Sequence, residues 1–134
     1  MNVSELPCYK NEKGEIQMIL ESCQIGSISR ITCLPNTFRA RHYHKDDYHV
    51  IIVNEGQITI YEKDRTVVDA LITVKVLNKG DIHYTRHQTD HQMNFNCHTV
   101  FDCYSFLSRT QQNYENDTVR LDYDMQEAFN RQVK

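Results

Sequence analysis

The sequence predicts an all-β domain in which short strands close into a two-sheet jelly roll, with a short helix at the C-terminus. Two observations carry this prediction. Short segments of alternating or β-branched residues recur along the chain, and Asn, Asp, Lys and isolated Gly residues separate them. Only one segment, near the end, has helical composition. The 134 residues suit a single domain, 1–134, that buries its own core.

The expected elements follow in chain order. Strands are predicted at 15–20, 26–33, 38–44, 48–53, 57–62, 67–77, 82–85 and within 94–107. In segment 26–33 only Ile31 and Cys33 share a face, so its pattern is weaker than the others. The loop Asn54-Glu55-Gly56 joins two of the strands as a hairpin. A helix is expected at 124–133, where Met125, Ala128 and Phe129 lie on one side.

Composition argues against several classes of protein. The net charge is -3, which gives no basic surface for nucleic acid, and no apolar run is long enough to span a membrane. The five cysteines are odd in number and form no CxxC pair, which argues against a disulfide framework. Residues 1–13 are polar and lack the apolar core of a signal peptide. We therefore expect reduced thiols in a cytoplasmic protein.

All seven histidines lie between residues 42 and 98. Side chains alternate along a strand, so His42 and His44 point to one face, roughly 6.6 Å apart at about 3.3 Å per residue. A turn at 45–47 returns the chain, and parity with Ile51 and Val53 points His49 inward. The spacing of His83, His87 and His91 suits a helix, but the residues between them favour strand, loop, strand.

These histidines resemble the two motifs of the cupin superfamily. His42-x-His44, His49 and Gly56 are similar to the first motif, with His49 where the family usually has Glu. Gly80-Asp81 and His91 are similar to the second. The resemblance covers about 27–108, with 109–134 as a tail. It departs from the family at several positions: Asn36 replaces the leading Gly, Arg86 and Gln88 replace Pro and Gly, and Phe95 replaces Asn.

The resemblance implies a barrel whose mouth binds a divalent transition metal. The implied ligands are His42, His44, His49 and His91. Imidazole ligands without a carboxylate favour Zn, Ni or Cu, and Fe also remains open. The alternative is a metal-free polar pocket in which the same histidines act as acid and base or line the pocket.

A narrower resemblance concerns Arg39-Ala40-Arg41-His42-Tyr43-His44 and the tail 113–121, which are similar to cupins that process nucleotide-linked sugars. It implies a sugar or nucleotide-sugar isomerase or epimerase, in which His42 and His44 transfer protons. Tyr43 is the third candidate catalytic residue, because it can donate a proton or stack on a sugar. The candidate substrate-binding residues are Arg39, Arg41, Tyr84 and His83.

Two other functions stay open. One is a metal-dependent dioxygenase or another small-molecule metalloenzyme, and the other is a non-catalytic cupin that binds a small ligand. Small cupins often dimerise through strand edges, so a homodimer is expected, with the N-terminal strands at 15–33 as the candidate contact.

Overall fold

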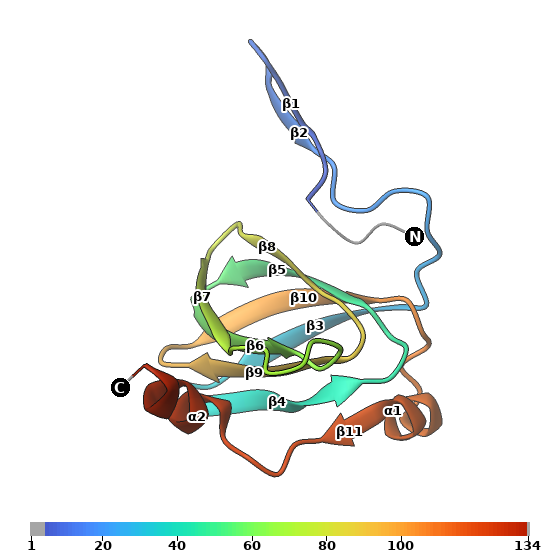
Figure 1. The fold of residues 1–134 in the computed structure, drawn as a ribbon. Helices are drawn as coiled ribbons and strands as arrows, with labels where there is room; N and C mark the ends of the chain where they lie inside the picture. The colour runs from blue at the N-terminus through green and yellow to red at the C-terminus, as the bar shows by residue number, and fades with distance from the viewer. Residues whose placement is uncertain (1–4, 134) are drawn as a thin grey trace.

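The computed structural model describes residues 5–133, so residues 1–4 and 134 of the predicted domain lie outside the described part. Two antiparallel sheets face each other and form the barrel (Figure 1). The smaller sheet has the order β3 (Ser27–Cys33), β10 (Thr99–Ser105), β5 (His49–Glu55) and β8 (Ile82–Thr85). The larger has the order β11 (Thr118–Arg120), β4 (Thr37–His44), β9 (Thr89–Phe95), β6 (Gln57–Asp64) and β7 (Thr73–Asn78). The predicted all-β jelly roll is confirmed.

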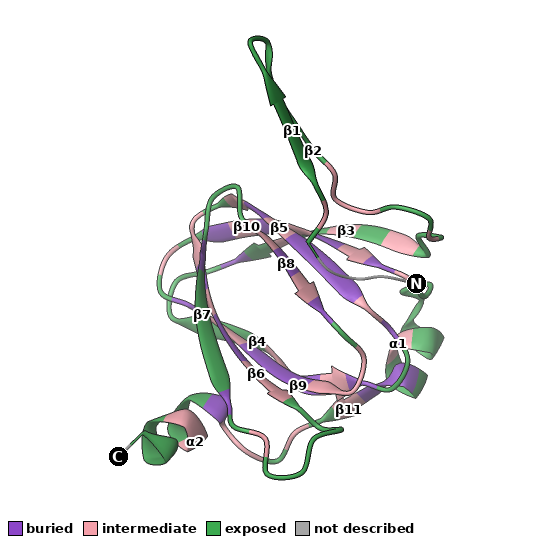
Figure 2. Ribbon diagram, turned by 45° about the horizontal axis from the view of Figure 1, so that its top comes forward, coloured by how far each residue is buried: buried purple, intermediate pink, exposed green. Residues whose placement is uncertain are grey.

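The space between the sheets is apolar at one end and polar at the other. Figure 2 shows buried residues along the strands that enclose it. The apolar end includes Phe95 and Phe101, whose rings stack with centroids 6.1 Å apart. The inward residues change in the same direction on the paired strands β9 and β6 and on β5 of the facing sheet: Phe95, Met93, His91 on β9; Ile58, Ile60, Glu62 on β6; Val53, Ile51, His49 on β5. Their polar members therefore lie at one end of the barrel.

Two short helices follow the last strand of the smaller sheet. The predicted C-terminal helix is confirmed as α2 (Met125–Gln132), which Asp124 caps at its N-terminus. Met125 of this helix is fully buried, in a cluster that includes Tyr61 and Ile72. Helix α1 (Gln111–Asp117) and the strand β11 after it were not predicted. Neither helix in residues 5–133 is long and apolar enough to cross a membrane.

An N-terminal hairpin projects from the barrel in Figures 1 and 2. It consists of β1 (Cys8–Asn11) and β2 (Gly14–Gln17), and every residue in both strands is exposed. Tyr9 and Ile16 lie opposite each other across the pair. The strand predicted at 15–20 therefore ends earlier, at Gln17, where the chain leaves the hairpin.

The strand predicted at 67–77 begins only at Thr73. A turn replaces its first part, because the Asp64 carboxylate accepts hydrogen bonds from the Thr66 backbone N–H and hydroxyl. Val68 in this loop is 88% exposed, whereas Ile72 packs against the C-terminal helix. The apolar composition of 67–72 therefore does not mark a strand.

Candidate functional site

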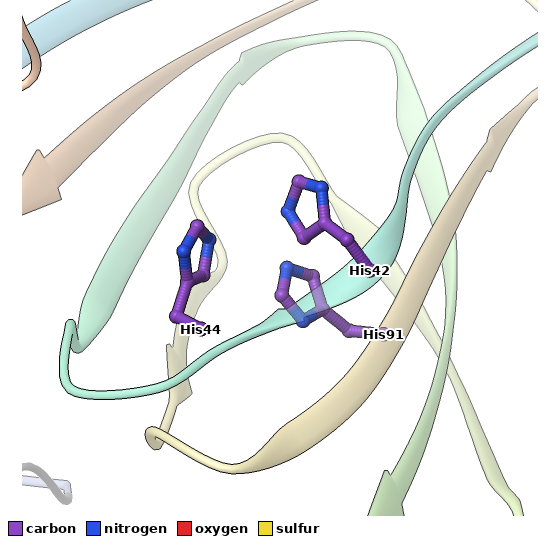
Figure 3. A group of neighbouring side chains, drawn as sticks. All are labelled: His42, His44 and His91. Carbon is purple, nitrogen blue, oxygen red and sulfur yellow. The ribbon is translucent and has the colours of Figure 1, made fainter. Parts of the chain in front are cut away.

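Three histidines from two neighbouring strands meet at the polar end of the barrel (Figure 3). His42 and His44 come from β4 and His91 from β9, and all three are buried. The ring centroid of His42 lies 4.7 Å from that of His44 and 4.7 Å from that of His91. One ring nitrogen from each residue lies within 4.8 Å of the others. The predicted common face of His42 and His44 is confirmed.

His49 points inward as its parity predicts, but it binds a carboxylate. Its ring centroid lies 4.4 Å from that of His44. Its Nε2 lies 3.0 Å from Oδ2 of Asp47, whose Oδ1 accepts hydrogen bonds from the backbone N–H groups of Phe106 and Leu107. The group of ring nitrogens that can share one ion contains three histidines, without His49. Of the four predicted ligands, the three that could hold one ion together are His42, His44 and His91.

The hydrogen bonds of His44 and His91 fix which ring nitrogen faces the interior. Nδ1 of His44 lies 3.2 Å from Oδ2 of Asp117, and Nδ1 of His91 lies 2.9 Å from the carbonyl oxygen of Thr89. Because these partners only accept, both Nδ1 atoms carry the proton and both Nε2 atoms keep a lone pair. The buried Nε2 of His44 has no hydrogen-bond partner among residues 5–133.

Burial keeps the three clustered rings neutral near neutral pH. It lowers the pKa of His42 to about 2 and that of His91 to about 4, and the pKa of His44 is also well below its usual range. The nearby histidines add to these shifts because two neighbouring imidazolium charges would repel each other. Burial is the largest single influence on His49 and opposes its charge, but the interactions with Asp47 and Cys103 together exceed it and raise the pKa of His49 to about 9.

A bulge in β4 decides which arginine faces the site. Ala40 and Arg41 have φ angles of 69° and 58°, and the pairing with β9 shifts between Ala40 and His42. The extra residue reverses the alternation, so Arg39 lines the same cavity as His42. Arg41 points to the opposite face, where it binds Gln92 and Asp124. Arg41 therefore does not line the histidine cavity, and its role in substrate binding stays a prediction.

The structure also places both predicted tyrosines outside the barrel. Tyr43 alternates with the two histidines of its strand, and its ring lies 4.1 Å beneath the guanidinium of Arg65. The hydroxyl of Tyr84 donates to the carbonyl of Ile19, at 2.9 Å, in the segment that follows the hairpin. Neither residue lines the histidine cavity, so the structure gives their predicted roles in catalysis and substrate binding no support.

His83 faces the interior, as a substrate contact would, but a carboxylate holds it. Its Nε2 lies 2.9 Å from Oε1 of Glu62, whose second oxygen accepts a hydrogen bond from Thr85. Glu62 lies opposite His91 across the strand pair. Burial opposes the charge of Glu62, but the bond to His83 lowers its pKa below the usual value. Sequence reasoning missed Glu62, although it has the inward parity of Ile58 and Ile60.

The cavity beside the histidines has a volume of about 90 Å³. Its polar lining comprises Arg39, His42, His49, Thr85, His91, Cys103, Arg109 and Tyr114. Helix α1 carries Tyr114, whose ring centroid lies 6.2 Å from that of His42, and the guanidinium of Arg109 lies 4.8 Å from the same tyrosine ring. Three larger hollows, of about 230, 450 and 700 Å³, lie elsewhere among the described residues, and no histidine lines them.

Arg109 and Tyr114 were not predicted to line the site, because the tail carries no motif apart from its family resemblance. Thr110, which caps α1 by accepting a hydrogen bond from the Asn113 N–H, was the available signal for a helix there.

The three clustered histidines have the properties of metal ligands. Each offers a neutral imidazole, and in His44 and His91 the second nitrogen donates to a carboxylate or a carbonyl, as in many metal sites. Three imidazoles suit Zn, Ni, Cu or Fe. The site can therefore present its nitrogen lone pairs either to a metal ion or to a proton.

No protein-family model and no curated protein sequence matches the chain. Solved structures match its fold over nearly its whole length. WlaRA, the TDP-fucose-3,4-ketoisomerase of Campylobacter jejuni, is 14% identical with a TM-score of 0.65, covering 93% of this chain and 90% of that one. QdtA, a sugar 3,4-ketoisomerase of Thermoanaerobacterium thermosaccharolyticum solved with TDP, is 21% identical with a TM-score of 0.63, covering 95% and 93%.

The chain has the cupin fold. A longer protein shares it: CapF, a capsular polysaccharide assembling protein from Staphylococcus aureus, is 13% identical with a TM-score of 0.63, over 87% of this chain. The chain covers 34% of CapF, so it spans about a third of that protein's length. In this chain the histidine cluster lies at the polar end of the barrel.

Proposed function

We propose that this cupin is a sugar 3,4-ketoisomerase that acts on a sugar linked to a nucleoside diphosphate. The observation that carries the proposal is the trio of buried, neutral histidines, one of which is oriented by Asp117, beside a cavity with two arginines in its lining. The fold, shared with ketoisomerases that include one solved with TDP, supports the same substrate class.

The chemistry requires proton transfer at two adjacent carbons. A base takes the proton from the carbon next to the carbonyl, the carbonyl oxygen gains a proton, and an enediol forms. The enediol then loses the proton of its other hydroxyl and gains one on the former carbonyl carbon. We assign the base to Nε2 of His44, because it keeps a lone pair and lacks another partner. His42, 4.7 Å away, is positioned to move the second proton.

The rim residues supply the binding chemistry for the nucleotide. Arg39 and Arg109 both line the cavity and can bind phosphate oxygens in a bidentate manner. Tyr114 covers the histidines and offers a flat face to the sugar. This set replaces the pair Arg39 and Arg41 that the sequence alone suggests, because Arg41 alternates with His42 onto the opposite face whereas the bulge brings Arg39 to the cavity.

A metalloenzyme is the second candidate, and the convergence of His42, His44 and His91 supports it. A bound divalent transition metal would supply Lewis acidity to a substrate oxygen. The dioxygenase alternative belongs to this candidate. If the protein turns over neither nucleotide-linked sugars nor dioxygenase substrates, the result would favour a cupin that only binds a small ligand.

We also propose a cytoplasmic homodimer. All five cysteines are free, as expected in a reducing compartment. The hairpin exposes Tyr9 and Ile16, and β3 is an edge strand on which Ile28 is 64% exposed. A second copy of the chain would cover these apolar groups and this edge. Light scattering of the wild type and of Ile16→Lys tests the contact: the wild type should have twice the mass of the chain and the variant should lose affinity.

The proposed reaction can be tested with TDP-linked 4-keto and 3-keto sugars. Nuclear magnetic resonance should show one keto sugar converting to the other in the presence of the enzyme, together with binding of TDP. A panel of such sugars that neither isomerises nor binds would overturn the proposal.

A further inference from the structure

The nitrogen that we assign as the base is closed off from solvent. Nε2 of His44 is buried and has no hydrogen-bond partner among residues 5–133. The cavity beside the histidines measures about 90 Å³, whereas pockets that hold drug-sized ligands measure about 300–1,000 Å³. A sugar linked to a nucleoside diphosphate therefore reaches the histidines only if part of the cavity wall moves.

One part of this wall comes from segment 108–116, which contains most of helix α1. Figure 1 shows α1 at the end of the barrel where β4 ends. The ring centroid of Tyr114 lies 6.2 Å from that of His42 and 6.4 Å from that of His44. Tyr114 and Arg109 both line the cavity, and the guanidinium lies 4.8 Å from the tyrosine ring. Both side chains thus belong to one short segment and contact each other.

Two buried carboxylates anchor the chain on either side of this segment. Just before it, Oδ1 of Asp47 accepts hydrogen bonds from the backbone N–H groups of Phe106 and Leu107, at 2.9 and 3.0 Å. Just after it, Oδ2 of Asp117 lies 3.2 Å from Nδ1 of His44. The two ends of the segment are therefore fixed to the barrel beside the histidine cluster.

Between these anchors the segment has few contacts with the barrel. Among the described residues, its hydrogen bonds join only residues within 110–118 to one another. Its ion pair, between Glu115 and Arg120 at 3.7 Å, joins side chains that are 48% and 64% exposed, and such pairs stabilise little. Tyr114 is half-buried and the other side chains of the segment are exposed. A segment with so few buried contacts can open locally at low cost.

We propose that residues 108–116 form a lid over the histidine cluster, with Tyr114 as the side chain that gates access to it. The lid opens about its two anchored ends and carries Tyr114 and Arg109 away from the cavity together. It closes over the bound ligand, which excludes water from the proton transfer. The opening is a property of the fold, whereas the admission of a nucleotide-linked sugar rests on the proposed function.

Cys103 provides a probe of lid opening that needs no substrate. It lines the cavity and is 3% exposed, whereas Cys33 lies in the same sheet, is 2% exposed and does not line the cavity. Iodoacetamide labelling of the native full-length protein, followed by peptide mass spectrometry, gives a rate for each thiol. Each rate is compared with that of the same thiol in a variant, so the intrinsic reactivity of the thiol cancels.

Tyr114→Ala should label Cys103 about tenfold or more faster than the wild type, because the ring that covers the cluster is gone, and it should leave Cys33 unchanged. Tyr114→Phe keeps the ring and should label Cys103 at the wild-type rate. Thr110→Ala, which removes the N-terminal cap of α1, is the second variant and should speed the labelling of Cys103 about fivefold. Thr110→Ser keeps the hydroxyl and is its control.

Two results would overturn the lid. One is labelling of Cys103 that stays at the wild-type rate in both Tyr114→Ala and Thr110→Ala. The other is an equal dependence of Cys103 and Cys33 labelling on low concentrations of urea, because the cavity would then open only when the barrel unfolds. Saturating TDP should slow the labelling of Cys103 in the wild type. Labelling that the variants accelerate but TDP does not slow would support the lid and count against the proposed function.

Discussion

Nδ1 of His44 lies 3.2 Å from Oδ2 of Asp117, a residue 73 positions further along the chain, and both side chains are buried. The second oxygen of Asp117 accepts the backbone N–H of Asp46 at 2.8 Å, so both carboxylate oxygens are held. The C-terminal tail thereby sets the tautomer of a histidine in β4. The lone pair of that histidine is directed away from the carboxylate and toward the cluster.

Asp117→Asn should lower kcat of the proposed isomerase by about 100-fold with little change in KM, because loss of an oriented base costs about 10²–10⁴-fold. Asn keeps an oxygen for the Asp46 N–H, but its amide donates to His44 and favours the wrong tautomer. Steady-state kinetics on a TDP-linked keto sugar measures this. Asp102→Asn, at an outer ion pair with Arg30, is the control and should leave kcat unchanged. A large rise in KM alone would contradict the positioning role.

Arg109→Ala should weaken TDP binding by about tenfold or more, since a charged hydrogen bond is worth about 1.5–3 kcal/mol. The residue lines the cavity, and its guanidinium lies over the ring of Tyr114. Isothermal titration calorimetry provides the affinity. Arg41→Ala, on the opposite face, serves as the comparison and should bind TDP as the wild type does. Equal losses in the two variants would argue against the bulge as the feature that selects the binding arginine.

The metal-free protein should lose stability as pH falls below about 6.5. His42, His44 and His91 have lowered pKa values in the folded state, so between pH 6.5 and those values the unfolded chain binds more protons. Glu62, whose pKa is also lowered, acts in the same direction. The raised pKa of His49 acts in the opposite direction, because its stabilising contribution grows as pH falls from about 9 and is nearly complete only below 6.5.

Three neutral histidines should together remove about 4 kcal/mol of unfolding free energy between about pH 7.5 and 5.5, and the growing contribution of His49 should offset about 1 kcal/mol of that loss. Urea unfolding at those pH values provides the measurement. His42→Asn should reduce the change over this range by about 1.4 kcal/mol, the share of one group. His98→Gln should leave the pH dependence unchanged, because the side chain of His98 is 49% exposed, beside Glu55. A wild-type curve that is flat over this range would mean that the three rings are not buried as neutral groups.

Added Zn²⁺ should inhibit the proposed isomerase, because a nitrogen that coordinates a metal has no lone pair left for a proton. The ring nitrogens of His42, His44 and His91 are close enough to share the ion. One equivalent should lower the rate by more than about tenfold, and a chelator should restore it. If a chelator instead abolishes the activity of the purified protein, the result would favour a metalloenzyme and would exclude a histidine base that acts without metal.

Local patterns on the strands predicted the barrel and the shared face of His42 and His44, because side chains alternate with a period of two. The same rule places Arg41 correctly on the face opposite His42, but it places Arg39 there too, since it assumes a regular strand. The left-handed φ values of Ala40 and Arg41 add one residue and bring Arg39 to the histidine cavity. No glycine marks this bulge in the sequence.

Local sequence patterns could not predict the contacts between segments that are distant in the chain. His49 has the expected parity, but its carboxylate partner Asp47 is held by N–H groups that follow β10. Tyr114 and Asp117 reach the histidines only because β11 pairs with β4. Such pairings depend on tertiary packing, which a single sequence does not display.

The most direct test of the central claim is deuterium incorporation into a TDP-linked keto sugar in heavy water. The wild type should place deuterium on the sugar carbons that exchange the carbonyl, and His44→Gln should slow that incorporation by about 10²-fold or more while still binding TDP. Incorporation at the wild-type rate in His44→Gln would contradict the account, since the buried, oriented imidazole would then not be the base.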